Sequence, residues 1–169
     1  MRFRTKRLEI KEISPDDREA MLDLMTNEIA GKTYMFPQFP SREAAQPLFE
    51  RIMSLSKDES RYVAGVYLDG QFIGMMNDVE RKGKQIEMGY VYLPAYYNQG
   101  FATEALAGAI TYLHEHGFDT VLTGAFSGNL ASLRVMEKCG MKKQTHNDTV
   151  DYRGITHTCI YYAASRGDQ

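Results

Sequence analysis

The sequence predicts a single domain, residues 1–169, of the mixed α/β class: four helices and a central, mostly antiparallel, twisted sheet of about seven strands, in the order βααβββαβαββ. Three observations support this fold class. Apolar residues alternate with polar ones, or form short runs between turn residues, in the middle and at the end of the chain. In other segments they recur at helical spacing. No internal repeat, low-complexity tract or linker interrupts the chain, so strands and helices should share one sheet.

The N-terminal part is predicted to form one strand and two helices. Residues 7–13 alternate between apolar and polar side chains, as in a half-buried strand. Ser14 follows and can cap a helix whose first turn contains proline and two aspartates. A connector rich in aromatic residues and proline, residues 34–40, leads to a second helix that Ser41 would cap.

The middle of the chain is predicted to be a three-stranded antiparallel meander followed by a long helix. Residues 61–67 and 71–76 are apolar runs joined by the Asp69-Gly70 pair, a strong hairpin signal. A second turn leads to the strand 86–93, which ends at proline. Apolar residues at helical spacing then predict a helix from Gly100 to Gly117.

The C-terminal part is predicted to add a strand, a helix and a closing hairpin. The strand spans residues 120–126, the helix 129–139, and the hairpin strands 141–150 and 155–163. The strand, helix, strand sequence around the long helix implies one parallel strand pair with a right-handed crossover.

Composition and charge exclude several classes of function. Lys and Arg number 20 and Asp and Glu 22, so no overall positive field attracts nucleic acid or an anionic membrane. No apolar stretch is long enough to span a bilayer, and we expect a cytoplasmic protein.

Cys139 and Cys159 do not have the spacing of a redox or metal motif and are expected to be packed, reduced thiols. His114 and His116 would point to different faces of a helix, and no metal site is predicted.

The junction between the strand 86–93 and the long helix has the composition of an anion site. Free amides at a helix start point toward one place, where the helix dipole is positive. Gly100 lets an oxygen approach the backbone, Ala102 is small, and the Thr103 hydroxyl can add a donor. The alternative is that Gly100 only shapes a turn. Neither the Gly-Lys-Ser/Thr of an NTP-binding loop nor the G-x-G-x-x-G of a dinucleotide fold is present.

Two motifs extend this hypothesis. Residues 94–105 (PAYYNQGFATEA) resemble the coenzyme A signature of the GNAT acetyltransferase superfamily, P-x-Y-[QR]-x-x-G-x-[GA]. Tyr97 departs from it, standing where Gln or Arg is usual. Residues 129–141 (NLASLRVMEKCGM) resemble the second GNAT signature, N-x-x-S-x-x-[VL]-x-E-K-x-G-[FM]. The resemblance implies the GNAT fold, acetyl-CoA as cosubstrate without a metal, and a coenzyme site made by Tyr92, Leu93, Tyr97, Asn98, Gln99, Gly100, Phe101, Ala102, Thr103, Asn129 and Ser132.

The resemblance also implies catalytic roles. Much of the superfamily has a tyrosine that protonates the departing thiolate, but Met136 stands at that position. In the ribosomal-protein N-terminal acetyltransferase branch, which the chain most resembles, a serine one turn earlier contacts the sulfur, so Ser132 is the candidate for this role. The alternative is that Asn129 and Ser132 cap the helix. Backbone amides near Tyr92 and Leu93 would bind the thioester carbonyl.

Direct attack by an amine needs a base, and Glu87 matches the position from which some family members supply one. A solvent-facing strand glutamate is the alternative, in which case Tyr90, Tyr92 and Tyr96 could order a water chain. An α-amino group, with a pKa of about 8, needs less help than lysine.

The acceptor would be a protein N-terminus or a small amine, bound by residues 27–41 and 146–154. Tyr34, Phe36 and Phe39 could line its cleft with Glu87, although packing onto the core is favoured for at least two of these aromatic residues. No acidic cluster that would mark a polyamine site is visible along the sequence. The rival hypothesis is a non-catalytic acyl-CoA-binding sensor, and the chain is expected to be a monomer or homodimer.

Overall fold

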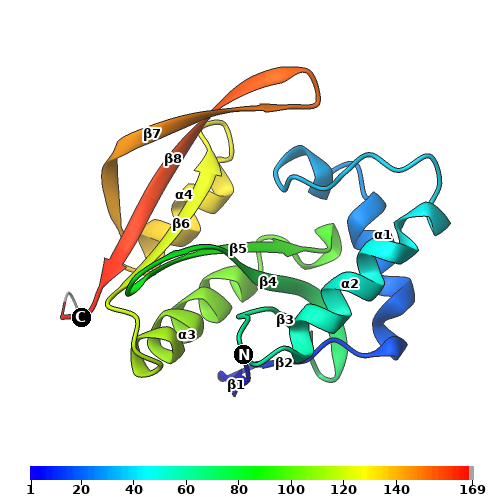
Figure 1. Cartoon of the computed structure of the whole chain (residues 1–169), viewed down its shortest axis with the longest axis horizontal. Coiled ribbons are helices and arrows are strands. Elements are labelled where there is room, and N and C mark those ends of the chain that lie inside the picture. Colours follow the sequence, from blue (N-terminus) through cyan, green and yellow to red (C-terminus); the bar gives the residue numbers. More distant parts are fainter. Residues whose placement is uncertain (168–169) are drawn as a thin grey trace. The chain divides into compact units, whose positions relative to one another are not determined.

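The computed structural model describes residues 1–167, and within this range the chain forms four α-helices and one mixed sheet (Figure 1). The sheet has eight strands, in the order β1-β2-β3-β4-β5-β6-β8-β7. The chain divides into two compact units. Unit 1 contains residues 1–77 and 90–105, and unit 2 contains residues 78–89 and the chain from 106 onward. Strands β4 and β5 contribute to both units, and the prediction of a single domain stays a prediction.

Unit 1 contains the first strands and helices. Its elements are β1 (Phe3–Arg4), β2 (Leu8–Lys11), α1 (Arg18–Thr26), α2 (Gln46–Lys57), β3 (Ala64–Leu68), the first part of β4 (Gln71–Lys82), the end of β5 (Gln85–Tyr92) and the start of α3 (Phe101–Glu115). Strands β1, β2 and β3 each pair antiparallel with the next strand along the chain. Side chains of α1, α2 and the neighbouring strands form one apolar core that includes Leu22, Phe49 and Met75. This core is the hydrophobic contribution that holds the unit together.

Unit 2 contains the closing strands and two helical segments. Its elements are the end of β4, the start of β5, most of α3, β6 (Thr120–Phe126), α4 (Leu130–Lys138), β7 (Lys142–Tyr152) and β8 (Ile155–Ser165). Strands β5 and β6 pair parallel, and β8 pairs antiparallel with both β6 and β7. Figure 1 shows β7 and β8 as a long twisted ribbon, coloured orange to red, beside β6.

Most predicted elements are confirmed. The Asp69-Gly70 pair forms the β3–β4 turn with both residues in the left-handed region, as this hairpin type requires. The predicted parallel pair is β5 with β6. The prediction that Ser41 caps the second helix is wrong: Ser41 accepts a hydrogen bond from the Ala44 amide at 3.2 Å, but a 3-10 turn, Glu43–Ala45, intervenes and the cap of α2 is Ala45. The count of seven strands is wrong by one, because the two-residue strand β1 is too short to produce a sequence pattern.

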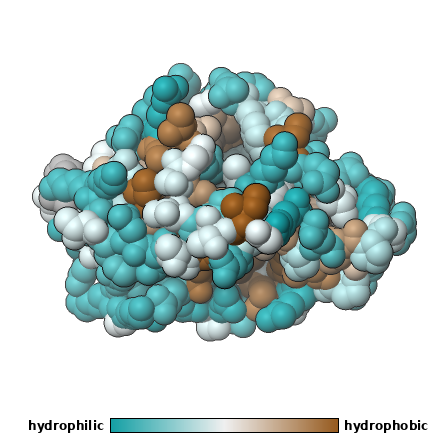
Figure 2. Space-filling model, turned by 90° about the horizontal axis from the view of Figure 1, so that it is seen from above, coloured by the Kyte–Doolittle hydropathy of each residue, from teal (hydrophilic) through white to brown (hydrophobic). Residues whose placement is uncertain are grey.

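Hydrophilic side chains predominate on the face of the molecule shown in Figure 2, and hydrophobic ones lie there in small groups. Large hydrophobic side chains that are at least one third exposed are Ile29, Met35, Val79, Tyr97, Leu130 and Ile155. Among residues 1–167 no helix is long and apolar enough to cross a bilayer.

Candidate functional site

The predicted anion turn of unit 1 has the backbone geometry of a cradle. After β5, residues Pro94–Tyr96 form a 3-10 turn, and α3 begins at Phe101. Between them Asn98 (φ 59°) and Gly100 (φ 81°) both adopt left-handed conformations. Glycine and asparagine are the residues that tolerate this region best, so the local sequence permits a sharp reversal of the chain. The reversal places the first turn of α3 directly after an exposed loop.

The amides of this turn are available to an anion. Within the described part of the chain, the amides of Gly100, Phe101 and Ala102 donate to no backbone carbonyl, whereas Glu104 donates to Gly100. The first amides of a helix have no intrahelical acceptor, and the helix dipole adds positive potential there. The turn therefore offers main-chain donors to an anion, and the pyrophosphate site stays a prediction.

The side chains of the turn have other tasks. Gln99 donates from Nε2 to the carbonyl of Ala95 at 2.9 Å, which fixes the loop before the helix. The ring of Phe101 is buried, and Tyr97 is 37% exposed. Partial burial raises the pKa of the Tyr97 hydroxyl, so this residue is neutral at physiological pH and supplies no cation. The coenzyme contacts predicted for Gln99 and Phe101 stay predictions.

Arg7 and Glu104 also belong to this turn, and the sequence hypothesis missed both. The Arg7 side chain donates to Glu104 at 2.7 Å and to the Gln99 carbonyl at 3.1 Å, and its guanidinium lies 4.5 Å from the Phe101 ring centre. A sequence separation above 90 residues hides this contact. The only sequence signal was the position of Glu104 in the first helical turn.

The end of β5 differs from the expectation in one respect. The amide of Leu93 donates to the carbonyl of Ile73 at 2.9 Å, so it is not a free donor for a thioester carbonyl. Gly74 permits this close approach, because a Cβ there would lie 2.5 Å from the Val91 carbonyl oxygen and 2.6 Å from the Tyr92 ring. The role of Leu93 is corrected to a strand contact, and that of Tyr92 stays a proposal.

In unit 2, Asn129 and Ser132 form the start of α4. The Asn129 Oδ1 atom accepts from the Ser132 amide at 3.2 Å, and the Asn129 Nδ2 atom donates to the Ser132 hydroxyl at 3.0 Å. Asn129 therefore caps α4, as the capping interpretation predicted for it, and the role of Ser132 stays a prediction. Because the Ser132 Oγ atom accepts this bond, the hydrogen of the Ser132 hydroxyl is not used in it. Met136, one turn later, is completely buried and has no proton to give.

Glu87 lies on the sheet face opposite Ile86 and Met88. Its neighbours Ile86 and Met88 are buried, whereas Glu87 is half-buried. Strand register places Glu87 on the same face as Asp148, because Glu87 pairs with Leu122, Leu122 with Ala163, and Asp148 with Cys159. Burial, followed by the charges of Glu80 and Asp148, raises the pKa of Glu87, and Lys82 opposes the shift.

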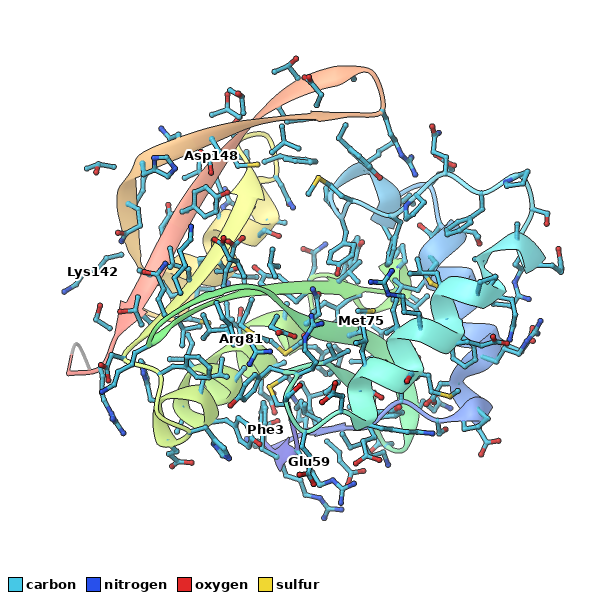
Figure 3. All side chains as sticks on the ribbon, in the orientation of Figure 1. Phe3, Glu59, Met75, Arg81, Lys142 and Asp148 are labelled. Carbon is cyan, nitrogen blue, oxygen red and sulfur yellow. The ribbon has the colours of Figure 1, made fainter. Side chains whose placement is uncertain are left out.

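Two carboxylates from other strands of unit 2 therefore act on Glu87. Glu80 lies on β4, Glu87 on β5 and Asp148 on β7, where Figure 3 labels it part way along the ribbon, well beyond Lys142. The separation of these residues in sequence concealed an acidic cluster that the sequence did not predict. Lys82 pairs with Glu80 at 2.9 Å and partly balances this charge, and the Nε2 atom of His146 lies 2.9 Å from Asp148.

Tyr161 lies beside these carboxylates. Its hydroxyl donates to Asp148 at 3.1 Å, and burial together with the Glu87 charge raises its pKa above the ordinary range. The ring lies over Gly124, where a Cβ would be 2.7 Å from a ring carbon. Gly124 thus gives the tyrosine room to reach Asp148.

The aromatic residues proposed for the acceptor cleft are mostly packed. Phe36 is 3% exposed and belongs to the core of unit 1, so its assignment to the cleft is wrong. Tyr34 and Phe39 pack partly against the same core. The Tyr34 hydroxyl donates to Asn77 at 2.6 Å, and burial raises its pKa. Packing onto the core is the main role of the connector, as favoured from the sequence.

Fold and turn together define an α/β protein with a main-chain anion cradle at a helix start. The family model of the acetyltransferase (GNAT) domain matches residues 7–142. The chain is also similar to the uncharacterized N-acetyltransferase YoaA of Bacillus subtilis (strain 168), at 24% identity over 145 residues, covering 83% of this chain and 82% of the relative. The chain therefore belongs to the GNAT acetyltransferase family, and it is an acetyl-CoA-dependent acetyltransferase.

Solved structures of this family have the same fold. A GNAT-family acetyltransferase from Bacillus anthracis has a TM-score of 0.83 at 23% identity, with 98% of each chain covered. The ribosomal L7/L12 alpha-N-protein acetyltransferase RimL, solved in complex with coenzyme A, has a TM-score of 0.80 at 16% identity, covering 98% of this chain and 97% of that one.

Proposed function

We propose that the protein acetylates the N-terminal α-amino group of a protein. The observation that carries this proposal is Glu87, a half-buried strand carboxylate whose pKa is raised by burial and by two neighbouring carboxylates. Such a carboxylate binds a proton more readily than an ordinary one. The neighbouring carboxylates give this face negative charge, which attracts an ammonium ion. The similarity of the fold to the ribosomal-protein acetyltransferase RimL supports the same choice.

The ionisation of the acceptor decides how strong a base is needed. At pH 7 an α-amine of pKa about 7.7–8.0 is roughly 10–15% neutral, whereas a lysine of pKa about 10.4 is roughly 0.04% neutral. The neutral fraction of an α-amine can attack the thioester directly, so a carboxylate such as Glu87 would only have to accept the proton that the nitrogen loses as the new C–N bond forms. We therefore favour an α-amine over a lysine side chain.

Each proposed residue has one task. The amides of Gly100, Phe101 and Ala102 would hold the pyrophosphate of acetyl-CoA, which supplies the activated acetyl group as a thioester. Asn129 would orient Ser132, and the Ser132 hydroxyl would donate a hydrogen bond to the departing thiolate. Glu87 would accept the proton of the attacking amine. No covalent bond to the protein is required.

Replacing Ser132 with alanine tests the thiolate role. We expect kcat to fall about 10- to 100-fold, because one charge-assisted hydrogen bond of about 1.5–3 kcal/mol is lost, with little change in KM for the acceptor. Stopped assays of thiol release measure both constants. Ser127→Ala, an exposed serine just before α4, is the matched control. Full turnover by the Ser132 variant would remove this assignment.

A panel of acceptors tests the proposed function itself. Thiol release from acetyl-CoA is followed with peptides that differ in their first residues, with the same peptides blocked at the N-terminus, and with small amines. Turnover that requires a free peptide N-terminus is the expected result. Turnover of small amines alone would contradict the proposal.

The acidic cluster favours a second candidate, the acetylation of a small cationic amine. Glu80, Glu87 and Asp148 together present negative charge that a polyamine could neutralise. The acceptor panel distinguishes the two candidates.

A further inference from the structure

Arg7 has a geometry that its position outside both GNAT-like motifs does not explain. Its Nη1 atom donates to the carbonyl of Gln99 at 3.1 Å, and its guanidinium lies 4.5 Å from the centre of the Phe101 ring. Its Nη2 atom is 3.4 Å from the point where a Cβ of Gly100 would lie. Arg7 therefore rests on the three residues that lead into α3, at the predicted pyrophosphate turn.

A phosphate can bind at this turn only if a cation balances the negative charge of Glu104. Its carboxylate accepts from the Arg7 amide at 2.7 Å, from Arg7 Nε at 2.7 Å and from the Thr5 hydroxyl at 2.6 Å. Burial raises the pKa of Glu104, but the bonds from Thr5 and Arg7 outweigh this and lower it, so the group is an anion at neutral pH. An unbalanced carboxylate in the first turn of α3 would repel a phosphate.

The turn has no other strong source of positive charge among its own residues. Residues 97–103 contain no Lys or Arg, and Tyr97 is neutral. In the described chain, the Nη2 atom of Arg7 donates no hydrogen bond to protein, while Nε and Nη1 are both used. The side chain is 41% exposed, so this nitrogen can meet a ligand.

We propose that Arg7 is a coenzyme-binding residue that provides the positive charge of the pyrophosphate turn. Its Nε atom and amide neutralise Glu104, its Nη1 atom holds the Gln99 carbonyl, and its Nη2 atom donates to a phosphate oxygen. Arg7 thus replaces the Gln or Arg that the family signature has at the position of Tyr97. The inference depends on coenzyme binding at this turn and is independent of the acceptor.

The test is calorimetric titration of Arg7→Gln with coenzyme A and with 3′-dephospho-coenzyme A. We expect Kd to rise about 10- to 100-fold for both ligands, because a charge-assisted bond is lost and Glu104 is uncovered. Equal losses identify the pyrophosphate, which both ligands contain. Arg4→Gln is the matched control, because Arg4 pairs with Glu9 and its side chain is 79% exposed. Its Kd should not change.

The double variant Arg7→Gln/Glu104→Gln separates charge from general damage to the fold. Removing the Glu104 carboxylate should recover at least threefold of the affinity lost in Arg7→Gln. A double variant as weak as the single one, a loss confined to the ligand with the 3′-phosphate, or an unchanged Kd overturns the proposal.

A second comparison covers the case in which Arg7→Gln does not fold. Glu104→Gln alone removes the carboxylate and keeps the arginine charge, so coenzyme A should bind as tightly as to the wild type, or more tightly. A tenfold weaker Kd for that folded variant would contradict the proposed charge balance. With S-acetylpantetheine, a phosphate-free donor, Arg7→Lys should keep wild-type kcat/KM. An equal loss with acetyl-CoA and with this donor would assign Arg7 a structural role only.

Discussion

Replacing Gly100 with glutamate is expected to abolish coenzyme A binding, with Kd rising at least 100-fold, or about 2.7 kcal/mol. Two effects add. Gly100 has a φ of 81°, where a side chain costs roughly 1–2 kcal/mol. The new carboxylate would also lie beside Arg7, whose Nη2 atom is 3.4 Å from the position of the new Cβ, and would oppose the phosphates. Calorimetric titration with coenzyme A measures the change.

Gly83→Glu is the matched control for this variant. Gly83 also has a left-handed backbone, with φ 59°, and an added Cβ there meets nothing within 4 Å. It should lose similar folding stability and keep its affinity for coenzyme A. Unchanged affinity in Gly100→Glu would remove the turn from the coenzyme site.

Glu87→Gln is expected to lower kcat/KM for a peptide acceptor about 100-fold, the usual contribution of a positioned base. Glutamine has the same shape but cannot accept the proton. Wild-type activity should fall as pH drops through the pKa of Glu87, which lies above the ordinary 4.5, because only the carboxylate is active. The rate of thiol release, measured as a function of pH, reports this decrease at acid pH. The Glu87→Gln variant should not show the decrease.

Removing a carboxylate next to Glu87 should shift the acid side of the pH–activity profile. The Glu80 carboxylate raises the pKa of Glu87, so Glu80→Gln should lower that pKa and shift the acid limb to lower pH. Glu59→Gln, an exposed residue labelled in Figure 3, serves as the control. A Glu87 variant with an unchanged profile would favour an ordered water chain as the base.

Most of the fold could be predicted from the sequence because local signals agree with the final structure. The Asp69-Gly70 turn and the strand 120–126 each depend on neighbouring residues alone. Strand β1 escaped prediction because two residues cannot show a period. The meander and the helices are thus encoded locally, and only the edge of the sheet is not.

The site was predicted less completely, for a physical reason. Main-chain features of the turn, including the left-handed Gly100, follow from a short motif. Contacts made across the sheet or between distant segments do not, and these include Arg7 with Glu104, Asp148 with Tyr161, and Leu93 with Ile73. Phe36 was wrongly assigned to the cleft because an aromatic connector has the same sequence pattern whether it packs inward or lines a cleft.

The division of the chain into two units affects how the family can diversify. The pyrophosphate turn lies wholly in unit 1, whereas Glu80, Glu87 and Asp148 all belong to unit 2. Substitutions in the β7–β8 hairpin can change the charge offered to an acceptor while every residue of the turn stays the same. Under the proposed function, such substitutions would alter the choice of amine and leave the turn that is proposed to hold acetyl-CoA unchanged.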